Sequence, residues 1–236
     1  MKHHYDASHH VRGESRFVDD APAPAGMLHA AVASSPVARG RLDAVDATAA
    51  LAIPGVVAVL IARDIPGENQ IGAILPDEPL LADGVVHFMG QPVALVLATD
   101  VATARRAAAA VDIRVTPEPP VLSARAAYAA GSFIAPPRTF RCGDIEAGFA
   151  AADVIVTGRC DIGGQEHLYL ETQRARATPG EGARMRVSSS TQSPYAVQKA
   201  VARVLGQALH EVEVDVPRLG GGFGGKEDQA TPWACL

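Results

Sequence analysis

Five glycines in six positions, Gly220–Gly225 around Phe223, constrain this chain more than any other feature. Each glycine adds backbone freedom that folding must remove, so such a run is unfavourable within an ordinary helix or strand. Glycines suit a place where the backbone approaches another group closely, or where successive N–H groups converge on an anion. The run follows an alternating segment, residues 211–216, and precedes a helix-like segment, residues 226–236. The sequence therefore predicts a strand, a ligand-binding loop and a helix in that order.

Two nucleotide-binding patterns fit this loop only in part. Gly220, Gly222 and Gly225 match the spacing of the dinucleotide fingerprint. That fingerprint needs an acidic residue about 20 positions later, and only 11 positions follow Gly225. The loop also matches a P-loop until Glu227 stands where Ser or Thr should hold Mg²⁺. A plain alternative stays open, in which the glycines mark a crossing where two elements touch.

A second unusual segment is Gly163–Gln173 (GGQEHLYLETQ). We interpret Gln165 as an amide donor toward an oxo or carbonyl group, held in place by the two glycines before it. The alternative is the start of a strand whose polar residues face solvent. Glu166 and His167 point to opposite faces of a strand, so they cannot easily share one metal ion. For these two residues and Glu171 we expect ordinary hydrogen bonding.

Composition excludes several classes of protein. The chain has 236 residues, of which 48% are hydrophobic and 20% charged, and this is typical of a globular protein of one or two domains. The net charge is −5 and no basic stripe carries aromatic residues, so we expect no nucleic-acid partner. The longest apolar run, Val56–Ala62, is far shorter than the roughly 18 residues of a membrane span. We therefore expect no membrane association.

Cysteine usage points to the cytoplasm. The three cysteines contain no CxxC pair, so this chain alone cannot build an iron–sulfur cluster or a zinc ribbon. An odd, sparse set fits reduced thiols, and residues 1–10 lack the apolar core of a signal peptide. The histidines at positions 3, 4, 9 and 10 are expected at the surface, without a metal.

The first 120 residues alternate strand-like and helix-like segments. Buried strands are predicted at Val56–Ala62 and Gln91–Ala98, and Asp100 can cap a helix that runs to Ala110. Val111–Val115 alternates apolar and polar residues, which indicates a half-exposed strand. Prolines then stop the pattern, and we predict a linker across roughly residues 117–141.

The second half contains the same kinds of element. Strand-like segments are Asp153–Cys160, Leu168–Ala177 and Arg184–Ser189, with a turn at Thr178–Gly182 between the last two. Ser193 and Pro194 are typical of a helix start. The helix has apolar residues on one face and ends at Gly206; these residues are Val197, Val201, Val204 and Leu205.

Three ordered motifs together resemble the molybdenum-cofactor subunit of the xanthine dehydrogenase and xanthine oxidase family. They are GGQEHLYLETQ (163–173), SSSTQSP (188–194) and RLGGGFGGKE (218–227). Upstream segments are similar to the N-terminal α/β-hammerhead domain of that family; they are GESRFVDD (13–20), PGVVAVLIARDIPG (54–67) and DEPLLADGVVHFMGQPVALVLA (77–98). The resemblance implies an α/β (α+β) fold. The hammerhead domain would occupy residues 1–120, a linker 121–140, and the first part of a mixed α/β molybdopterin-binding domain 141–236.

The resemblance also implies an activity and its cofactors. Members of the family hydroxylate purines, hypoxanthine and xanthine to urate, with water as the oxygen source. Molybdenum–molybdopterin carries this chemistry, and electrons leave through 2Fe–2S clusters to FAD. The 2Fe–2S clusters and FAD belong to other domains or subunits. The implied partners are therefore an iron–sulfur/FAD subunit in a hetero-oligomer and, as substrate, a purine.

The residues that carry over are few. Gln165 matches the glutamine that hydrogen-bonds the molybdenum oxo ligand, and Phe223 matches the residue whose backbone lies at the metal. The glycines of the cofactor-binding loop are Gly221, Gly222 and Gly224. Glu227 matches the carboxylate that binds the purine, where related aldehyde oxidases have an apolar residue. A desolvated carboxylate needs a donor partner, so Glu227 favours a purine substrate.

The chain departs from the family in extent. Family members are several times longer, and the general base and further substrate contacts are absent from these 236 residues. Trp233 and Leu236 would have nothing to pack on. We therefore expect a truncated, N-terminal portion that is inactive alone. The alternatives are a non-catalytic hammerhead module that docks on an iron–sulfur/FAD subunit, an aldehyde oxidase-type relative, and a nucleotide-binding protein.

Overall fold

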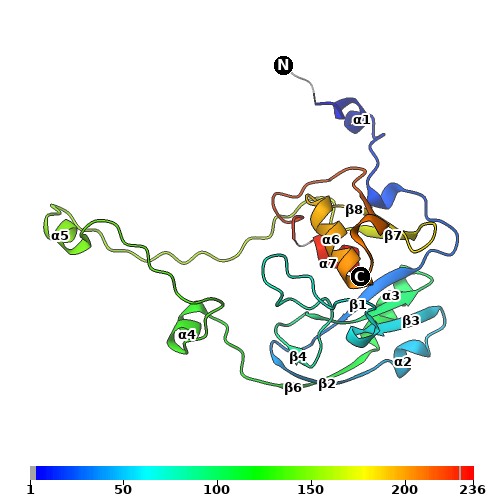
Figure 1. Ribbon diagram of the computed structural model, residues 1–236, viewed down its shortest axis with the longest axis horizontal. Helices are drawn as coiled ribbons and strands as arrows, with labels where there is room; N and C mark the ends of the chain where they lie inside the picture. Colours follow the sequence, from blue (N-terminus) through cyan, green and yellow to red (C-terminus); the bar gives the residue numbers. More distant parts are fainter. Residues whose placement is uncertain (1–3, 229) are drawn as a thin grey trace. The chain divides into compact units, whose positions relative to one another are not determined.

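The computed structural model describes residues 4–228 and 230–236, and the chain divides into two units (Figure 1). One unit runs to Pro119 and resumes at His167, and the other is Pro120–Glu166. The described strands all belong to the first unit. This unit also contains the helices α1 (Ala7–Val11), α2 (Thr48–Leu51), α3 (Val101–Ala109), α6 (Pro194–Leu205) and α7 (Ala230–Cys235).

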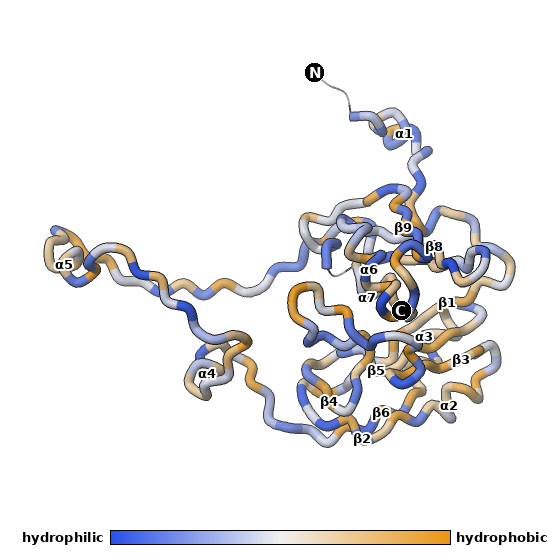
Figure 2. The backbone as a smooth tube through the Cα atoms, in the orientation of Figure 1, coloured by the Kyte–Doolittle hydropathy of each residue, from blue (hydrophilic) through white to orange (hydrophobic). Residues whose placement is uncertain are grey.

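The first antiparallel sheet has the strand order β1–β5–β3, with bounds His29–Ser34, Pro92–Ala98 and Val56–Ile61. The central strand β5 is buried, and Val93 and Val96 have no exposed surface. These strands are strongly apolar (Figure 2). Both predicted strands are confirmed, but β3 lies at the sheet edge and Val57 is 54% exposed. A single apolar run does not distinguish an edge strand from a central one.

Helix α3 covers this sheet as predicted. The Asp100 carboxylate accepts a hydrogen bond from the Thr103 N–H at 2.8 Å and so caps the helix. The Thr103 hydroxyl, which also donates to the Asp100 carboxylate, and then this backbone bond lower the pKa of Asp100. Ala104 and Ala107 are fully buried and belong to the helix face that meets β1 and β5. Alanines on that face let the helix approach the sheet closely.

The second antiparallel sheet has the order β4–β2–β6, with bounds Val85–Val86, Gly40–Asp46 and Asp112–Pro117. Exposed and half-buried residues alternate along most of β6, as predicted for a strand with one solvated face. Val86 of β4 and Val93 of β5 are fully buried in one apolar cluster. Because this cluster joins strands of both sheets, the two sheets share a core.

The third sheet has the order β7–β8–β9, with bounds Ala175–Pro179, Met185–Ser189 and Val212–Asp215. Strands β7 and β8 are antiparallel, whereas β8 and β9 are parallel. The predicted apolar face of α6 packs on this sheet, and Val197 and Val187 are fully buried in one cluster. Gly206 ends the helix in a left-handed conformation at φ 66°, as predicted. Ser193 occupies the cap position but its hydroxyl caps no amide.

The predicted strand at Asp153–Cys160 is wrong, because no strand forms there. The unit Pro120–Glu166 contains only the short helices α4 (Ala124–Ala129) and α5 (Ile145–Ala150), which Ser123 and Asp144 cap. A strand needs a hydrogen-bonding neighbour, and the described residues of this unit offer none. In the same way, the predicted strand Leu168–Ala177 forms only from Ala175, where β7 begins.

The two halves of the first unit are joined by backbone and side-chain contacts. The Gly67 N–H donates to the Val204 carbonyl of α6 at 2.9 Å. Leu236 packs with Leu80, Leu81 and Val204, so the expectation that it lacks packing partners is wrong. Trp233 is 51% exposed. No described helix is long and apolar enough to cross a membrane.

Candidate cofactor-binding site

The carboxyl ends of two parallel strands define the candidate site. β8 ends at Ser189 and continues into Ser190–Gln192, and β9 leads through residues 216–218 into the glycine loop, Leu219–Glu227. Ligands of α/β sheets bind outside the carboxyl ends of parallel strands. The parallel pairing of β8 and β9 therefore brings two of the quoted motifs to one edge of the third sheet.

A buried lysine anchors the glycine loop. Lys226 has no exposed surface, and its Nζ donates to the Glu171 carbonyl at 2.6 Å and to the Ser190 hydroxyl at 2.7 Å. The same Nζ lies 3.3 Å from Glu171 Oε2 and 4.6 Å from the centroid of the Tyr169 ring. Glu171 Oε2 also accepts hydrogen bonds from the Ser190 hydroxyl and the Gly220 N–H, both at 2.7 Å. The charge of Lys226 is thus paired and hydrogen-bonded, as a buried charge must be.

Gln192 holds the other end of the loop. Its Oε1 accepts the Gly224 N–H at 2.9 Å and the Lys226 N–H at 3.2 Å. The Gln192 N–H donates to the Lys226 carbonyl at 2.7 Å, and the Thr191 hydroxyl donates to the same carbonyl at 3.1 Å. The segment after β8 therefore fixes the carboxyl end of the loop through both backbone and side chain.

Three glycines of the loop are required by close packing. A Cβ atom on Gly220 would lie 2.4 Å from Glu171 Cβ, and one on Gly222 would lie 2.5 Å from Gln192 Oε1. A Cβ atom on Gly225 would lie 2.8 Å from the His167 ring. These contacts confirm the plain alternative for these positions: they mark a crossing where elements touch.

Three consecutive amides of the loop have no acceptor within the described residues; Gly221 is half-buried, Gly222 is buried and Phe223 is exposed. Within the described residues, the N–H groups of Gly221, Gly222 and Phe223 donate to no protein acceptor. Gly221 and Phe223 have positive φ angles of 101° and 54°. Positive φ is strained for a bulky residue such as Phe, and such strain concentrates at functional sites. Free successive amides in this conformation fit an anionic or oxo group.

The remaining predicted site residues lie as follows. Gly224 is on the loop, but Gln192 already accepts its N–H. Glu227 directly follows Lys226, and its side chain is exposed. The desolvation that we expected for this carboxylate is therefore not found within the described residues. Gln165 is exposed and belongs to the other unit. Phe223 is 76% exposed, with its ring in solvent.

Metal ligation by side chains is not indicated. The described residues contain no cluster of three or more His, Cys, Asp or Glu side chains that could hold a metal ion. His4, His9 and His10 are exposed, as expected, and His3 lies outside the described residues. Glu171 makes the hydrogen bonds given above, so the expectation of ordinary hydrogen bonding is confirmed for it.

Sequence reasoning missed the residues that hold the loop. Gln192 stood inside a quoted motif and Lys226 adjoined Glu227, but neither received a role. Their contacts join positions 32 to 55 residues apart, which no local pattern reveals. The only available signal was that each lies in a motif already singled out.

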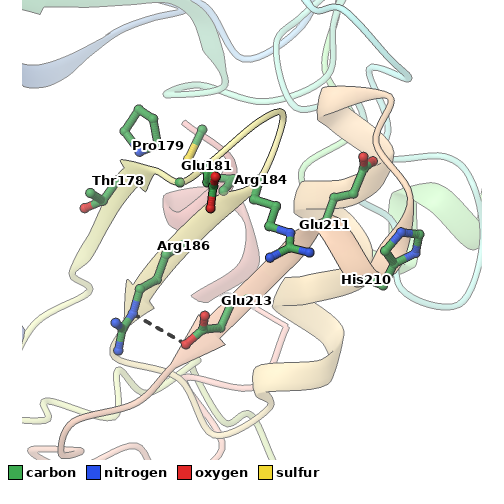
Figure 3. A pocket seen from close by; sticks show the side chains of 10 residues that line it. Thr178, Pro179, Glu181, Arg184, Arg186, His210, Glu211 and Glu213 are labelled. Atoms are coloured by element: carbon green, nitrogen blue, oxygen red, sulfur yellow. Dashed lines mark ion pairs between the residues drawn. The ribbon is translucent and has the colours of Figure 1, made fainter.

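A cleft of about 350 Å³ opens at the opposite end of β8, away from the glycine loop (Figure 3). It is lined by the β7–β8 turn and by residues around the start of β9. Arg186 and Glu213, paired on the neighbouring strands β8 and β9, form an ion pair at 3.6 Å, and Arg184, Glu211 and His210 also line the cleft. Since side chains of both charge signs line the cleft, it favours neither an anionic nor a cationic ligand.

Two family models match the chain in order. Residues 12–119 match the aldehyde oxidase and xanthine dehydrogenase a/b hammerhead domain, and residues 129–236 match the molybdopterin cofactor-binding domain. The chain belongs to the aldehyde oxidase and xanthine dehydrogenase family. The predicted fold class, an α/β-hammerhead domain followed by a molybdopterin-binding domain, is confirmed. The boundaries at residues 120 and 140 stay predictions.

The chain is similar in sequence to both xanthine dehydrogenases and aldehyde oxidases. The chain is 40% identical over 233 residues to xanthine dehydrogenase 1 of Arabidopsis thaliana, which covers 96% of this chain and 17% of the relative. It is 39% identical over 225 residues to aldehyde oxidase 3 of Rattus norvegicus, covering 94% and 17%. The chain thus spans about a sixth of the length of these curated relatives.

Solved structures agree with the fold. The aldehyde oxidoreductase from Desulfovibrio gigas superposes with a TM-score of 0.85 at 28% identity, covering 98% of this chain and 28% of that one. Quinoline 2-oxidoreductase from Pseudomonas putida 86 superposes with a TM-score of 0.80, also at 28% identity, covering 96% and 31%. The three free amides fit the family's cofactor, because molybdopterin is anionic and suits a set of N–H donors.

Proposed function

We propose that this chain is part of a molybdenum hydroxylase that oxidises purines. Its place in the family and the three free amides of the glycine loop support the enzyme class. The observation that carries the proposal is the row of Gly221, Gly222 and Phe223 amides, fixed from both sides at the carboxyl ends of β8 and β9.

Each candidate residue has a distinct task in this proposal. When bound, the molybdenum cofactor supplies the two-electron oxidation of a carbon with oxygen from water. The free amides of the loop bind an oxygen-bearing part of the cofactor and require no side-chain rearrangement. Gln165 donates its amide to an oxo group. Glu227 accepts a hydrogen bond from a ring N–H of the purine.

Glu227 is the residue that separates a purine from an aldehyde substrate. A heterocyclic N–H can pair with the carboxylate, whereas an aldehyde offers no donor to it. The relatives include both xanthine dehydrogenases and aldehyde oxidases, and substitution of Glu227 distinguishes the two substrate classes.

The test compares Glu227→Ala with Asp228→Ala in an enzyme of full family length that carries these 236 residues. Asp228 is the adjacent exposed carboxylate and serves as the matched control. We expect Glu227→Ala to raise KM or lower kcat for xanthine, with less effect on an aldehyde, and Asp228→Ala to change neither. Equal loss on both substrates would mean that Glu227 is structural and would contradict the purine assignment.

The further partners belong to the same proposal. FAD and 2Fe–2S clusters are held by other domains or by an iron–sulfur/FAD subunit, in a hetero-oligomer of the cytoplasm. Cys142, Cys160 and Cys235 are free thiols, consistent with a reducing compartment. We expect the 236 residues alone to form no urate from xanthine. Co-purification with the partner subunit without bound pterin would favour a non-catalytic docking module instead.

A further inference from the structure

Two separate segments hold the glycine loop and leave its middle free. Glu171 Oε2 accepts the Gly220 N–H on one side. Gln192 Oε1 accepts the Gly224 and Lys226 N–H groups on the other side. The amides of Gly221, Gly222 and Phe223, which have no acceptor within the described residues, lie between these two sets of hydrogen bonds. The loop is therefore held on both sides of these three amides.

A single oxygen of Gln192 accepts two of the loop amides, those of Gly224 and Lys226. Lys226 is buried, and an unpaired amide shielded from water is costly, so its N–H needs this acceptor. The Gly225 N–H donates to the Gly222 carbonyl at 2.7 Å and closes a tight turn within the same stretch. Without Gln192 Oε1, the amides of Gly224 and Lys226 would lose their acceptor, and the turn could open.

The position of Gln192 is itself determined by its surroundings. Its N–H donates to the Lys226 carbonyl at 2.7 Å. Its side chain lies directly against Gly222, where even a methyl group would collide with Oε1, Cδ and Cγ. The Gln192 side chain is exposed as a whole, yet its oxygen is used twice. Burial of an apolar surface therefore does not account for a glutamine at this position.

We propose that Gln192 is a positioning residue for the molybdenum cofactor, which it affects by fixing the loop segment that carries the unpaired amides of Gly221–Phe223. The inference rests on the proposed function, since it assumes that these amides receive the cofactor. Gln192 acts through the loop and need not touch the cofactor. Loss of two hydrogen bonds of ordinary strength corresponds to roughly a tenfold or larger change in affinity.

The test uses the cofactor-loaded enzyme of full family length and the variant Gln192→Met, which keeps the chain length but removes the acceptor. The conservative variant Gln192→Glu retains an oxygen at the same position. The matched control is Gln198→Met, because the Gln198 side chain also makes two hydrogen bonds, to the Leu209 and Val212 carbonyls, away from the loop. Molybdenum and pterin content, the rate of pterin release on mild heating, and the Mo(V) electron paramagnetic resonance spectrum are measured.

We expect Gln192→Met to release pterin roughly tenfold faster or more and to alter the Mo(V) spectrum. Gln192→Glu should restore both properties, and Gln198→Met should resemble the unmodified enzyme. Equal release and an unchanged spectrum in Gln192→Met would overturn the inference while leaving the proposed function intact. An unmodified enzyme without molybdenum and pterin would overturn both. If Gln192→Met does not accumulate, Gln192→Asn, whose oxygen is drawn back by one methylene, decides the question with the same measurements.

Discussion

Replacement of Lys226 by methionine tests the anchor of the glycine loop. The Lys226 side chain is fully buried, and the Glu171 side chain that it pairs with is 11% exposed. Methionine fills a similar volume but leaves the Glu171 carboxylate without its counter-charge and the Glu171 carbonyl without its 2.6 Å donor. Removing one partner of a buried ion pair costs about 3–5 kcal/mol in free energy of unfolding. At about 2–4 °C per kcal/mol for a chain of this size, the melting temperature should fall by roughly 6–20 °C.

The assay is thermal unfolding of the 236-residue chain, followed by circular dichroism at pH 7. Lys199→Met is the matched control, because Lys199 is exposed on α6 and its Nζ lies 5.7 Å from the Tyr195 ring. We expect that control to change stability by less than about 0.5 kcal/mol. Equal melting temperatures for the two variants would refute the reasoning, because the burial and pairing of Lys226 would then contribute nothing.

Two further predictions concern packing and thiol chemistry. Gly220→Ala places a methyl 2.4 Å from Glu171 Cβ and should destabilise by about 1–3 kcal/mol in urea unfolding, whereas Gly148→Ala in α5 meets nothing within 4 Å and should not. Equal changes in the free energy of unfolding for the two variants would contradict the close packing of Gly220 against Glu171. Burial raises the pKa of Cys235 from 9.0 to about 12, so at pH 8 a thiol reagent should modify the two exposed cysteines quickly and Cys235 only after unfolding. Equal modification rates for all three cysteines would contradict the burial of Cys235. The contribution of this raised pKa to the free energy of unfolding is fully present below pH 9 and is lost as the pH rises toward 12.

Local signals in the sequence were sufficient for several elements. Asp100 before an alanine-rich run predicted α3, and Pro194 and Gly206 bracketed α6, because caps and helix formers act within one turn. The segment Asp153–Cys160 had the composition of a strand but forms none. Composition does not say whether a neighbouring strand is present to receive its hydrogen bonds.

The candidate site was predicted in position but not in detail. The glycine run indicated a loop with usable amides, and the structure adds which amides are free. That selection depends on Glu171 and Gln192, which lie 49 and 32 residues in sequence from the loop residues that they bind. The exposure of Glu227 was likewise beyond any pattern in the sequence.

The central claim is that the amides of Gly221, Gly222 and Phe223 receive the cofactor. A structure of the cofactor-loaded enzyme, at a resolution that places backbone nitrogens, tests this most directly. We expect at least one of these nitrogens within about 2.7–3.2 Å of a cofactor oxygen, with Gln192 Oε1 still bonded to the Gly224 and Lys226 amides. A cofactor bound elsewhere, with all three amides turned to water or to other protein acceptors, would contradict the account.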